Sequence, residues 1–166
     1  MILLHRGKDL PDFRSRLFSL IWSGIGAAVA IGLALWLVAG EHSPFLLASL
    51  GGSTVFLFAL TDAEAAQPRA LFGGHLGGAL IGVLCFQLFG DGLWVSVAAV
   101  VLTMAFMVAA KAIHPPAGAN PLFMVHHHAG FSAVLYPVGL GVMVLFMIAL
   151  VWSRLRPGRA YPTQWW

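Results

Sequence analysis

The sequence predicts an all-α polytopic membrane protein, and three observations support that fold class. Of the 166 residues, 60% are hydrophobic and only 9% are charged, whereas a soluble domain has roughly 25% charged residues. The mean hydropathy is +0.89. Four long stretches contain no Asp, Glu, Lys or Arg, and each approaches the roughly 20 residues that a helix needs to cross a bilayer. We therefore expect one transmembrane domain over residues 1–166, in contact with the lipid bilayer and with no nucleic-acid partner.

Six apolar segments follow one another along the chain. The four long ones, expected to be transmembrane helices, span residues 17–39, 70–89, 93–110 and 131–152. Helix is the expected state because a lone strand in lipid would leave its backbone polar groups unpaired. Two shorter segments, 45–60 and 117–125, contain glycine or proline, so we expect short broken or re-entrant helices. The first long segment exceeds the apolar core of a typical signal peptide, which predicts a retained anchor.

The positive charges predict the topology. If all six segments cross the membrane, one side receives all nine Lys and Arg residues, whereas four crossings would move Arg69 and Lys111 to the other side. The positive-inside rule therefore favours six crossings with both termini in the cytoplasm, and we expect a bacterial plasma membrane. The nine residues are Arg6, Lys8, Arg14, Arg16, Arg69, Lys111, Arg154, Arg156 and Arg159. The opposite side receives Glu41, His42, Asp91, His126, His127 and His128.

The order long, short, long occurs twice, in residues 17–89 and 93–152. Three crossings per half would place the second copy upside down, so the pattern predicts an inverted 3+3 repeat whose broken helices meet near the midplane. Chance similarity is the alternative, because small residues are common in membrane helices. Glycines at 74, 78 and 82, and the small residues at 24, 28 and 32, predict close helix packing.

The stretch AAKAIHPPAGANPLF, residues 109–123, contains the strongest signal for a site. Pro115 and Pro116 disfavour helix in the residues before them, so one helix ends here and another restarts at Pro116 or Ala117. A new helix N-terminus offers unpaired N–H groups to an anion. We expect such N-termini here and at the GGST sequence, with these candidate ligands: Gly51, Gly52, Ser53, Thr54, Gly118, Ala119 and Asn120. The alternative is that these residues only cap two short helices.

Four titratable residues are further candidates. His114 lies at the break and His75 in an otherwise apolar segment, where either imidazole is able to bind an anion or exchange a proton. The alternative is a histidine bonded to a free backbone carbonyl. Arg69 follows Gln67 and Pro68 at a helix start, and its guanidinium suits a planar oxyanion. Alternatively, Arg69 pairs with an acidic neighbour, Asp62 or Glu64, and Arg69 and Lys111 are only cytoplasmic anchors.

The remaining signals do not indicate a catalytic or metal site. Consecutive histidines 126–128 diverge by about 100° per residue on a helix, and no neighbouring Cys, Asp or Glu completes a coordination set. Cys85 is alone and lies in an apolar run, as expected for a buried thiol. No nucleophile-elbow, phosphate-loop or zincin motif occurs. We expect neither an enzyme nor a cofactor.

Three motifs in order resemble the HPP family of small integral membrane proteins. They are LGGSTVFLF at 50–58, AQPRALFGGHLGGALIGV at 66–83 and HPPAGANPL at 114–122. The structural part of this pattern consists of Gln67, Pro68, Pro115 and Pro116. The family is usually described as having four transmembrane helices, and its characterised members resemble nitrite transporters of plastids and cyanobacteria. Two stretches depart from the family pattern, Thr61-Asp62-Ala63-Glu64 and Gly118-Ala119-Asn120-Pro121, and both lie near the predicted site.

The resemblance implies transport of a small inorganic anion, nitrite first and nitrate second. Two other hypotheses remain from the residues themselves: a membrane sensor or interaction subunit, and a metal-cation carrier. A chain of this length needs partners to line a wide pore, so a homo-oligomer is also expected.

Overall fold

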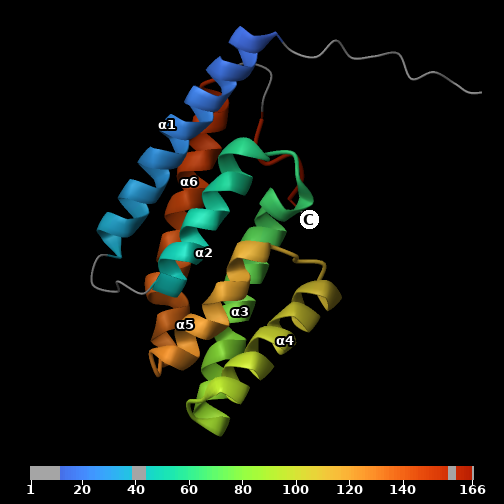
Figure 1. Cartoon of the computed structure of the whole chain (residues 1–166). Helices are drawn as coiled ribbons and strands as arrows, with labels where there is room; N and C mark the ends of the chain where they lie inside the picture. The colour runs from blue at the N-terminus through green and yellow to red at the C-terminus, as the bar shows by residue number, and fades with distance from the viewer. Residues whose placement is uncertain (1–11, 39–43, 157–159, 166) are drawn as a thin grey trace, which may run out of the picture.

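The computed structural model describes residues 12–38, 44–156 and 160–165 of the chain, and its elements are all helical (Figure 1). The six α-helices are α1 (Phe13–Leu37), α2 (Pro44–Thr54), α3 (Pro68–Phe89), α4 (Leu93–Ala109), α5 (Asn120–His126) and α6 (Leu140–Arg154). The π-helical turn Val55–Ala59 extends α2, and a second one, Val134–Gly139, precedes α6. Short 3₁₀ turns cover Glu64–Ala66 and Pro115–Ala119. The predicted all-α class is confirmed.

Among the described residues, three helices, rather than the predicted four, are long and apolar enough to cross a bilayer. They are Phe13–Leu37, Pro68–Phe89 and the combined helix Val134–Arg154. The third predicted helix, α4, has 17 residues, which gives a length of about 26 Å at 1.5 Å per residue, below the roughly 30 Å of a hydrocarbon core. It ends at Ala109, because the backbone turns at Lys111 with φ of 51°.

The two short segments are helical, but one of them starts elsewhere than predicted. The break at Pro115 is present, since α4 ends at Ala109 and a 3₁₀ turn begins at Pro115. The expected helix N-terminus at Gly51 is wrong, because α2 begins at Pro44 and Gly51 lies in its last turn. A Cβ at Gly52 would lie 3.1 Å from the Cβ of Pro116. The small residue at 52 therefore permits close packing of the two short segments.

Glycines along α3 let the broken segment lie directly against this helix. A Cβ at Gly74 would lie 2.9 Å from the Cβ of His114, and one at Gly82 would lie 2.6 Å from the Cα of Pro121. Such contacts require glycine, so the predicted packing role of the α3 stripe is confirmed. The predicted stripe on α1 is wrong for contacts within the described chain, since a Cβ at Gly24 or Gly32 would meet no atom within 4 Å.

The buried face of α1 is offset by two residues from that prediction. It consists of Gly26, Ala30 and Ala34. A Cβ at Gly26 would lie 2.6 Å from the indole Nε1 of Trp152 on α6. Small residues four positions apart do form the buried face of α1, as predicted, but this face is not the one that contains Gly24 and Gly32.

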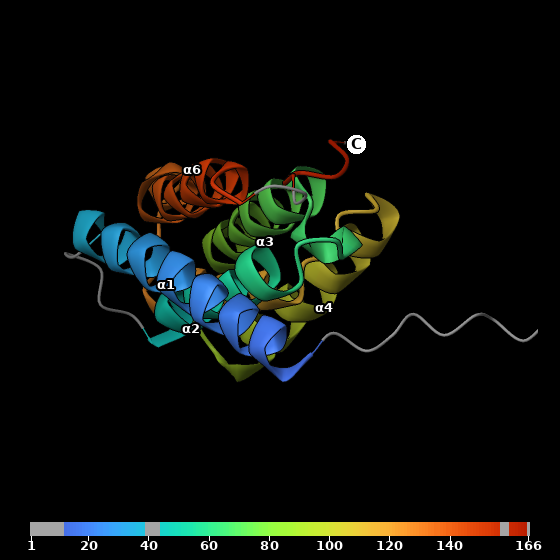
Figure 2. The same cartoon turned by 90° about the horizontal axis from the view of Figure 1, so that it is seen from above.

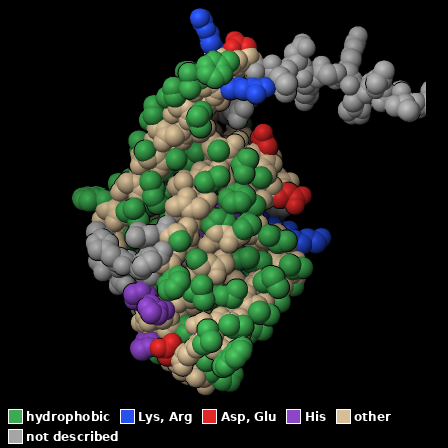
Figure 3. All heavy atoms as spheres, in the orientation of Figure 1, with side chains coloured by type: hydrophobic (Ala, Val, Ile, Leu, Met, Phe, Trp, Pro, Cys, Tyr) green, Lys and Arg blue, Asp and Glu red, His purple; other side chains and the backbone are tan. Residues whose placement is uncertain are grey.

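The connections lie at two opposite ends of the bundle, and the described Lys and Arg residues are not found at the end that carries the histidines (Figure 1, Figure 3). The start of α1, the 60–67 connection and the C-terminal region lie in the upper part of Figure 1, whereas the α3–α4 turn and the end of α5 lie in the lower part. Seen from above in Figure 2, α1 and α6 lie to one side of the bundle and α4 to the other. Figure 3 shows a largely hydrophobic surface, with Lys, Arg and acidic groups above and to the right, and histidines with an acidic group below. The predicted positions of Arg6, Lys8, Glu41, His42 and Arg159 fall outside the described residues.

Candidate functional site

Five polar side chains meet inside the bundle, where they are shielded from solvent. Ser49 and Ser53 come from α2, His75 from α3, His114 from the helix break and Asn120 from the first position of α5. Each of the five residues has a relative exposure of 0%. Polar side chains are costly to bury without hydrogen bonds, and in a membrane protein they are candidates for a functional site. We call these five residues the polar cluster.

Ser53 joins the two histidines of the polar cluster. Its Oγ lies 2.9 Å from His75 Nε2 and 2.9 Å from His114 Nε2. It also lies 2.7 Å from the backbone carbonyl oxygen of Ser49. The two imidazole rings have centroids 5.0 Å apart. One hydroxyl therefore bridges two titratable groups that are separated by 39 positions in the sequence.

The other ends of the cluster are also hydrogen-bonded. His114 Nδ1 donates to the carbonyl of Ala65 at 2.6 Å. The amide nitrogen of Asn120 lies 2.9 Å from His75 Nδ1 and donates to the His75 carbonyl at 3.0 Å. The carbonyl oxygen of the Asn120 side chain is buried and has no partner among the described residues. The cluster thus retains one free acceptor.

Local sequence explains how these side chains come together. Ser49 and Ser53 are four residues apart, so they lie on one face of α2. Pro115 holds His114 in an extended conformation, with φ of −130° and ψ of 94°. Gly74 leaves space for the Cβ of His114. The His114 imidazole therefore reaches Ser53 and lies next to the imidazole of His75 on α3.

Four members of the cluster are residues that the sequence predicts as candidates: Ser53, His75, His114 and Asn120. The prediction missed Ser49, whose spacing of four residues from Ser53 was the available signal. The other predicted ligands lie outside the cluster. The hydroxyl of Thr54 donates to the Gly51 carbonyl at 2.7 Å, and Gly51, Gly52, Gly118 and Ala119 are half-buried.

Arg69 lies apart from the cluster and binds a helix end. Its Nη2 and Nε donate to the carbonyl of Ala110 at 2.7 and 3.2 Å. Among the described residues it makes no hydrogen bond to Asp62 or Glu64, so the expected alternative of an acidic partner is wrong here. Arg69 and Lys111 line a cavity of about 180 Å³ together with Glu64, Gln67 and Gln164. Two cations therefore flank an opening beside the connection that carries Ala65.

Gln67 and Pro68 organise that connection. Pro68 is the first residue of α3. The Gln67 amide donates to the carbonyls of Thr61 and Ala63 at 2.9 and 3.0 Å, and its oxygen accepts from the backbone of Thr163 at 3.0 Å. These bonds hold the loop whose Ala65 carbonyl accepts the hydrogen bond from His114 Nδ1.

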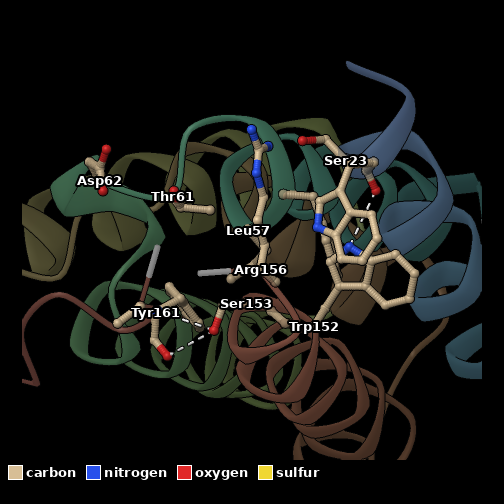
Figure 4. Close-up of a pocket in the computed structure, with 12 residues that line it drawn as sticks. Ser23, Leu57, Thr61, Asp62, Trp152, Ser153, Arg156 and Tyr161 are labelled. Carbon is tan, nitrogen blue, oxygen red and sulfur yellow. Dashed lines mark hydrogen bonds between the residues drawn. The ribbon is translucent and has the colours of Figure 1, made fainter. Parts of the chain in front are cut away.

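The C-terminal tail also contacts this connection, which the sequence did not predict. The hydroxyl of Tyr161 donates to the Ala66 carbonyl at 2.8 Å, and burial raises the pKa of that hydroxyl above its ordinary value. Figure 4 shows Tyr161 hydrogen-bonded to Ser153 at the edge of a small cavity of about 40 Å³. Arg156 and Trp152 line the same cavity, which lies beside the tail and does not include the polar cluster.

The triple histidine has a different environment. His128 Nε2 lies 3.2 Å from Asp91 Oδ2, and this hydrogen bond is the main reason that the pKa of Asp91 is lowered. The ring of His128 stacks on Phe86 with centroids 4.9 Å apart. Within residues 12–38, 44–156 and 160–165, no three His, Cys, Asp or Glu side chains are grouped as metal ligands would be.

The comparisons with known proteins agree on a membrane family. A family model described as "HPP, transmembrane region" matches residues 13–162. A transmembrane protein of Dictyostelium discoideum is 30% identical over 174 aligned positions, which cover 97% of this chain and 56% of the relative. A second one from the same organism is 32% identical over 175 positions, covering 98% of this chain and 61% of the relative. The chain thus spans under two thirds of these curated relatives. No solved structure matches it.

Proposed function

Since the chain belongs to the HPP transmembrane family, we propose that it is a transporter, not an enzyme, and that it moves a small monovalent anion, nitrite first and nitrate second. The observation that carries this proposal is the pair of buried histidines bridged by Ser53 at a helix break. A fixed charge at this depth would hold an anion tightly. Imidazole and hydroxyl groups carry no permanent charge, so they release an anion more readily, which suits a substrate that must also leave.

The hydrogen bonds of the polar cluster favour a carrier over an open pore. The imidazole and amide donors are bonded to protein acceptors, so an entering anion has to exchange with one of these bonds. Such an exchange requires movement of α2 or of the 115–126 segment. The close contact between Gly52 and Pro116 makes the interface of these segments the place where that movement occurs.

The cavity at Arg69 and Lys111 serves as the cytoplasmic mouth in this proposal. Arg69 and Lys111 outnumber Glu64 in the lining, and this excess positive charge raises the local anion concentration, while Arg69 remains bonded to Ala110. The volume of about 180 Å³ accommodates a three-atom anion with part of its hydration shell.

The packing of the helices supports an inverted repeat. The repeat would exchange α1 with α4, α2 with the 115–126 segment, and α3 with α6. These helix pairs then have counterparts in the structure: α1 packs on α6 as α4 packs on α3, and α1 packs on α2 as α4 packs on α5. Likewise, α2 contacts α6 as α5 contacts α3. We also propose that both termini are cytoplasmic, that the membrane is a bacterial plasma membrane, and that a homo-oligomer is the working assembly.

Uptake of isotopically labelled nitrite into vesicles that contain the purified chain tests this function. We expect His114→Ala to reduce uptake about tenfold or more, since a hydrogen bond to a charged group contributes about 1.5–3 kcal/mol. The matched control is His127→Ala, which removes an exposed histidine near the end of α5. Protein-free vesicles correct for nitrous acid that crosses lipid unaided.

Three outcomes would contradict the proposal. Absence of uptake by the folded wild-type protein would favour a sensor or interaction subunit. Movement of a metal cation without movement of the anion would favour the metal carrier. Equal uptake by the folded His114→Ala protein and the wild type would remove His114 from the anion pathway.

A further inference from the structure

The hydrogen-bond partners in the polar cluster determine where the protons lie. The side-chain nitrogen assigned to Asn120 contacts the His75 backbone carbonyl at 3.0 Å. A carbonyl only accepts, so that atom must be the amide NH₂ group and not the amide oxygen. The same NH₂ lies 2.9 Å from His75 Nδ1, which is therefore the acceptor nitrogen. A neutral His75 then carries its proton on Nε2 and donates it to Ser53.

His114 is the opposite tautomer, with its proton on Nδ1. Its Nδ1 faces the Ala65 carbonyl at 2.6 Å and must carry the proton, so Nε2 of the neutral ring is an acceptor. The Ser53 hydroxyl accepts from His75 and donates to His114. All donors from Asn120 to Ala65 consequently point in one direction along the chain of hydrogen bonds.

Ser53 has a second acceptor for its hydroxyl proton. The Ser49 carbonyl lies 2.7 Å from Ser53 Oγ, compared with 2.9 Å for His114 Nε2. If a proton binds His114 Nε2, the Ser53 hydroxyl rotates to the Ser49 carbonyl, and its oxygen then accepts from both imidazoles. No hydrogen bond is left unpaired at the Ser53 hydroxyl or at the two bridging Nε2 atoms in either state. The only net change is one added proton and one added positive charge.

We propose that His114 binds one proton, that Ser53 acts as the switching hydroxyl, and that this proton accompanies the anion across the membrane. The inference rests on the proposed function and adds its coupling ion. The positive charge on the protonated cluster attracts the anion, and the anion offsets the cost of a buried charge. Each ligand therefore favours binding of the other, and one proton and one monovalent anion cross together without net charge movement.

No charged side chain among the described residues is a direct neighbour of His114. Its direct neighbours are Ser53 on α2, the ring of Phe56 at 5.4 Å, the Ala65 carbonyl and His75 on α3. His75 is the titratable group among them. The charged groups on the adjoining segments are Asp62, which is exposed, and Glu64, Arg69 and Lys111, which line the cavity at the mouth. Ala65 directly follows Glu64, so the His114 hydrogen bond ends next to that cavity.

Vesicles with separately imposed gradients test this coupling. We expect an inward proton gradient to drive nitrite accumulation, and a potassium diffusion potential set with valinomycin to leave the uptake rate unchanged. Uptake that follows the potential and ignores the proton gradient would overturn the coupling while leaving anion transport intact. Absence of any uptake would instead refute the proposed function, so the two failures are distinguishable.

A second experiment isolates Ser53. We expect Ser53→Ala to reduce proton-driven uptake about tenfold, because the bridge between the imidazoles is lost. Ser96→Ala, a change of the same size on the half-buried face of α4, is the control that retains uptake. Equal proton-driven uptake by the folded Ser53→Ala protein and the wild type would overturn the switching role.

Nitrogen NMR of ¹⁵N-histidine-labelled protein in lipid gives a readout independent of transport. Neutral His75 should show a protonated Nε2 and neutral His114 a protonated Nδ1, and acidification should convert His114 to the doubly protonated ring. The same tautomer at both rings, or no protonation of His114 over the pH range that drives uptake, would refute the proposal.

Discussion

At the scale of single residues, the polar cluster depends on small side chains as much as on polar ones. His114 reaches Ser53 because Gly74 has no side chain at the point of contact, where an added Cβ would lie 2.9 Å from His114 Cβ and 3.3 Å from the Ala112 carbonyl. Interiors are packed closely enough that one added methyl group displaces its neighbours. The histidine and the glycine thus form one structural unit.

Gly74→Ala should therefore destabilise the protein by about 1–3 kcal/mol, the usual range for overpacking. The methyl group would push His114 away from Ser53 and reduce nitrite uptake as well. Thermal unfolding in detergent measures the first effect. Gly24→Ala is the control, since its Cβ would meet no atom within 4 Å, and it should not lower the transition temperature, because Ala is preferred to Gly inside a helix. Equal transition temperatures for the two variants would contradict the close contact.

At the scale of elements, the 60–67 connection is held from two sides. Gln67 bonds it from within, and the tail bonds it through Tyr161 and Thr163. This connection supplies the Ala65 carbonyl that selects the tautomer of His114. The tail therefore supports the polar cluster indirectly, although it has no side chain there.

Gln67→Ala removes the side-chain bonds to the carbonyls of Thr61 and Ala63 and to the tail. Each such bond contributes about 1 kcal/mol, so we expect a loss of roughly 2–4 kcal/mol. The tail should also become accessible to carboxypeptidase digestion. Gln87→Ala, at an exposed position near the end of α3, should change neither quantity. A tail that remains protected in Gln67→Ala would show that Tyr161 alone is sufficient to hold it.

At the scale of the whole molecule, the apolar surface and the positions of the Lys and Arg residues indicate how the bundle lies in a membrane. Exposed large hydrophobic side chains occur on α1, α3, α4 and α6, as expected where lipid replaces water. The connections at 60–67 and 127–133 lie toward opposite ends of the molecule (Figure 1). A membrane between these ends would place the Arg69 cavity on one side and the triple histidine on the other.

Single-cysteine labelling tests this orientation. In a Cys85→Ala background, Asp62→Cys should react with a membrane-impermeant maleimide only from the cytoplasmic side, and Ser132→Cys only from the opposite side. Both positions are exposed in the structure, so a missing reaction would reflect the membrane and not burial within the protein. Reaction of both cysteines from the same side would contradict the six-crossing topology.

The sequence by itself determined the membrane class, the family resemblance, the positions of the apolar segments and the break at Pro115. These properties depend on the composition of the chain and on backbone preferences that are set by residues close together in the sequence. It also indicated His75 and His114, because polar groups are costly in an apolar segment. Ser53 and Asn120 were candidates as donors at expected helix N-termini, of which the one at Gly51 is wrong.

The hydrogen bonds and packing contacts between those residues follow from the tertiary structure. The choice of buried face on α1, the true start of α2, the Ser53 bridge and the docking of the tail all depend on contacts between segments far apart in the chain. Helical periodicity predicts which residues share a face, but which face is buried depends on how the helix backbones pack together. In this molecule the fit depends on the glycines of α3, which let a broken helix approach until two imidazoles share one hydroxyl.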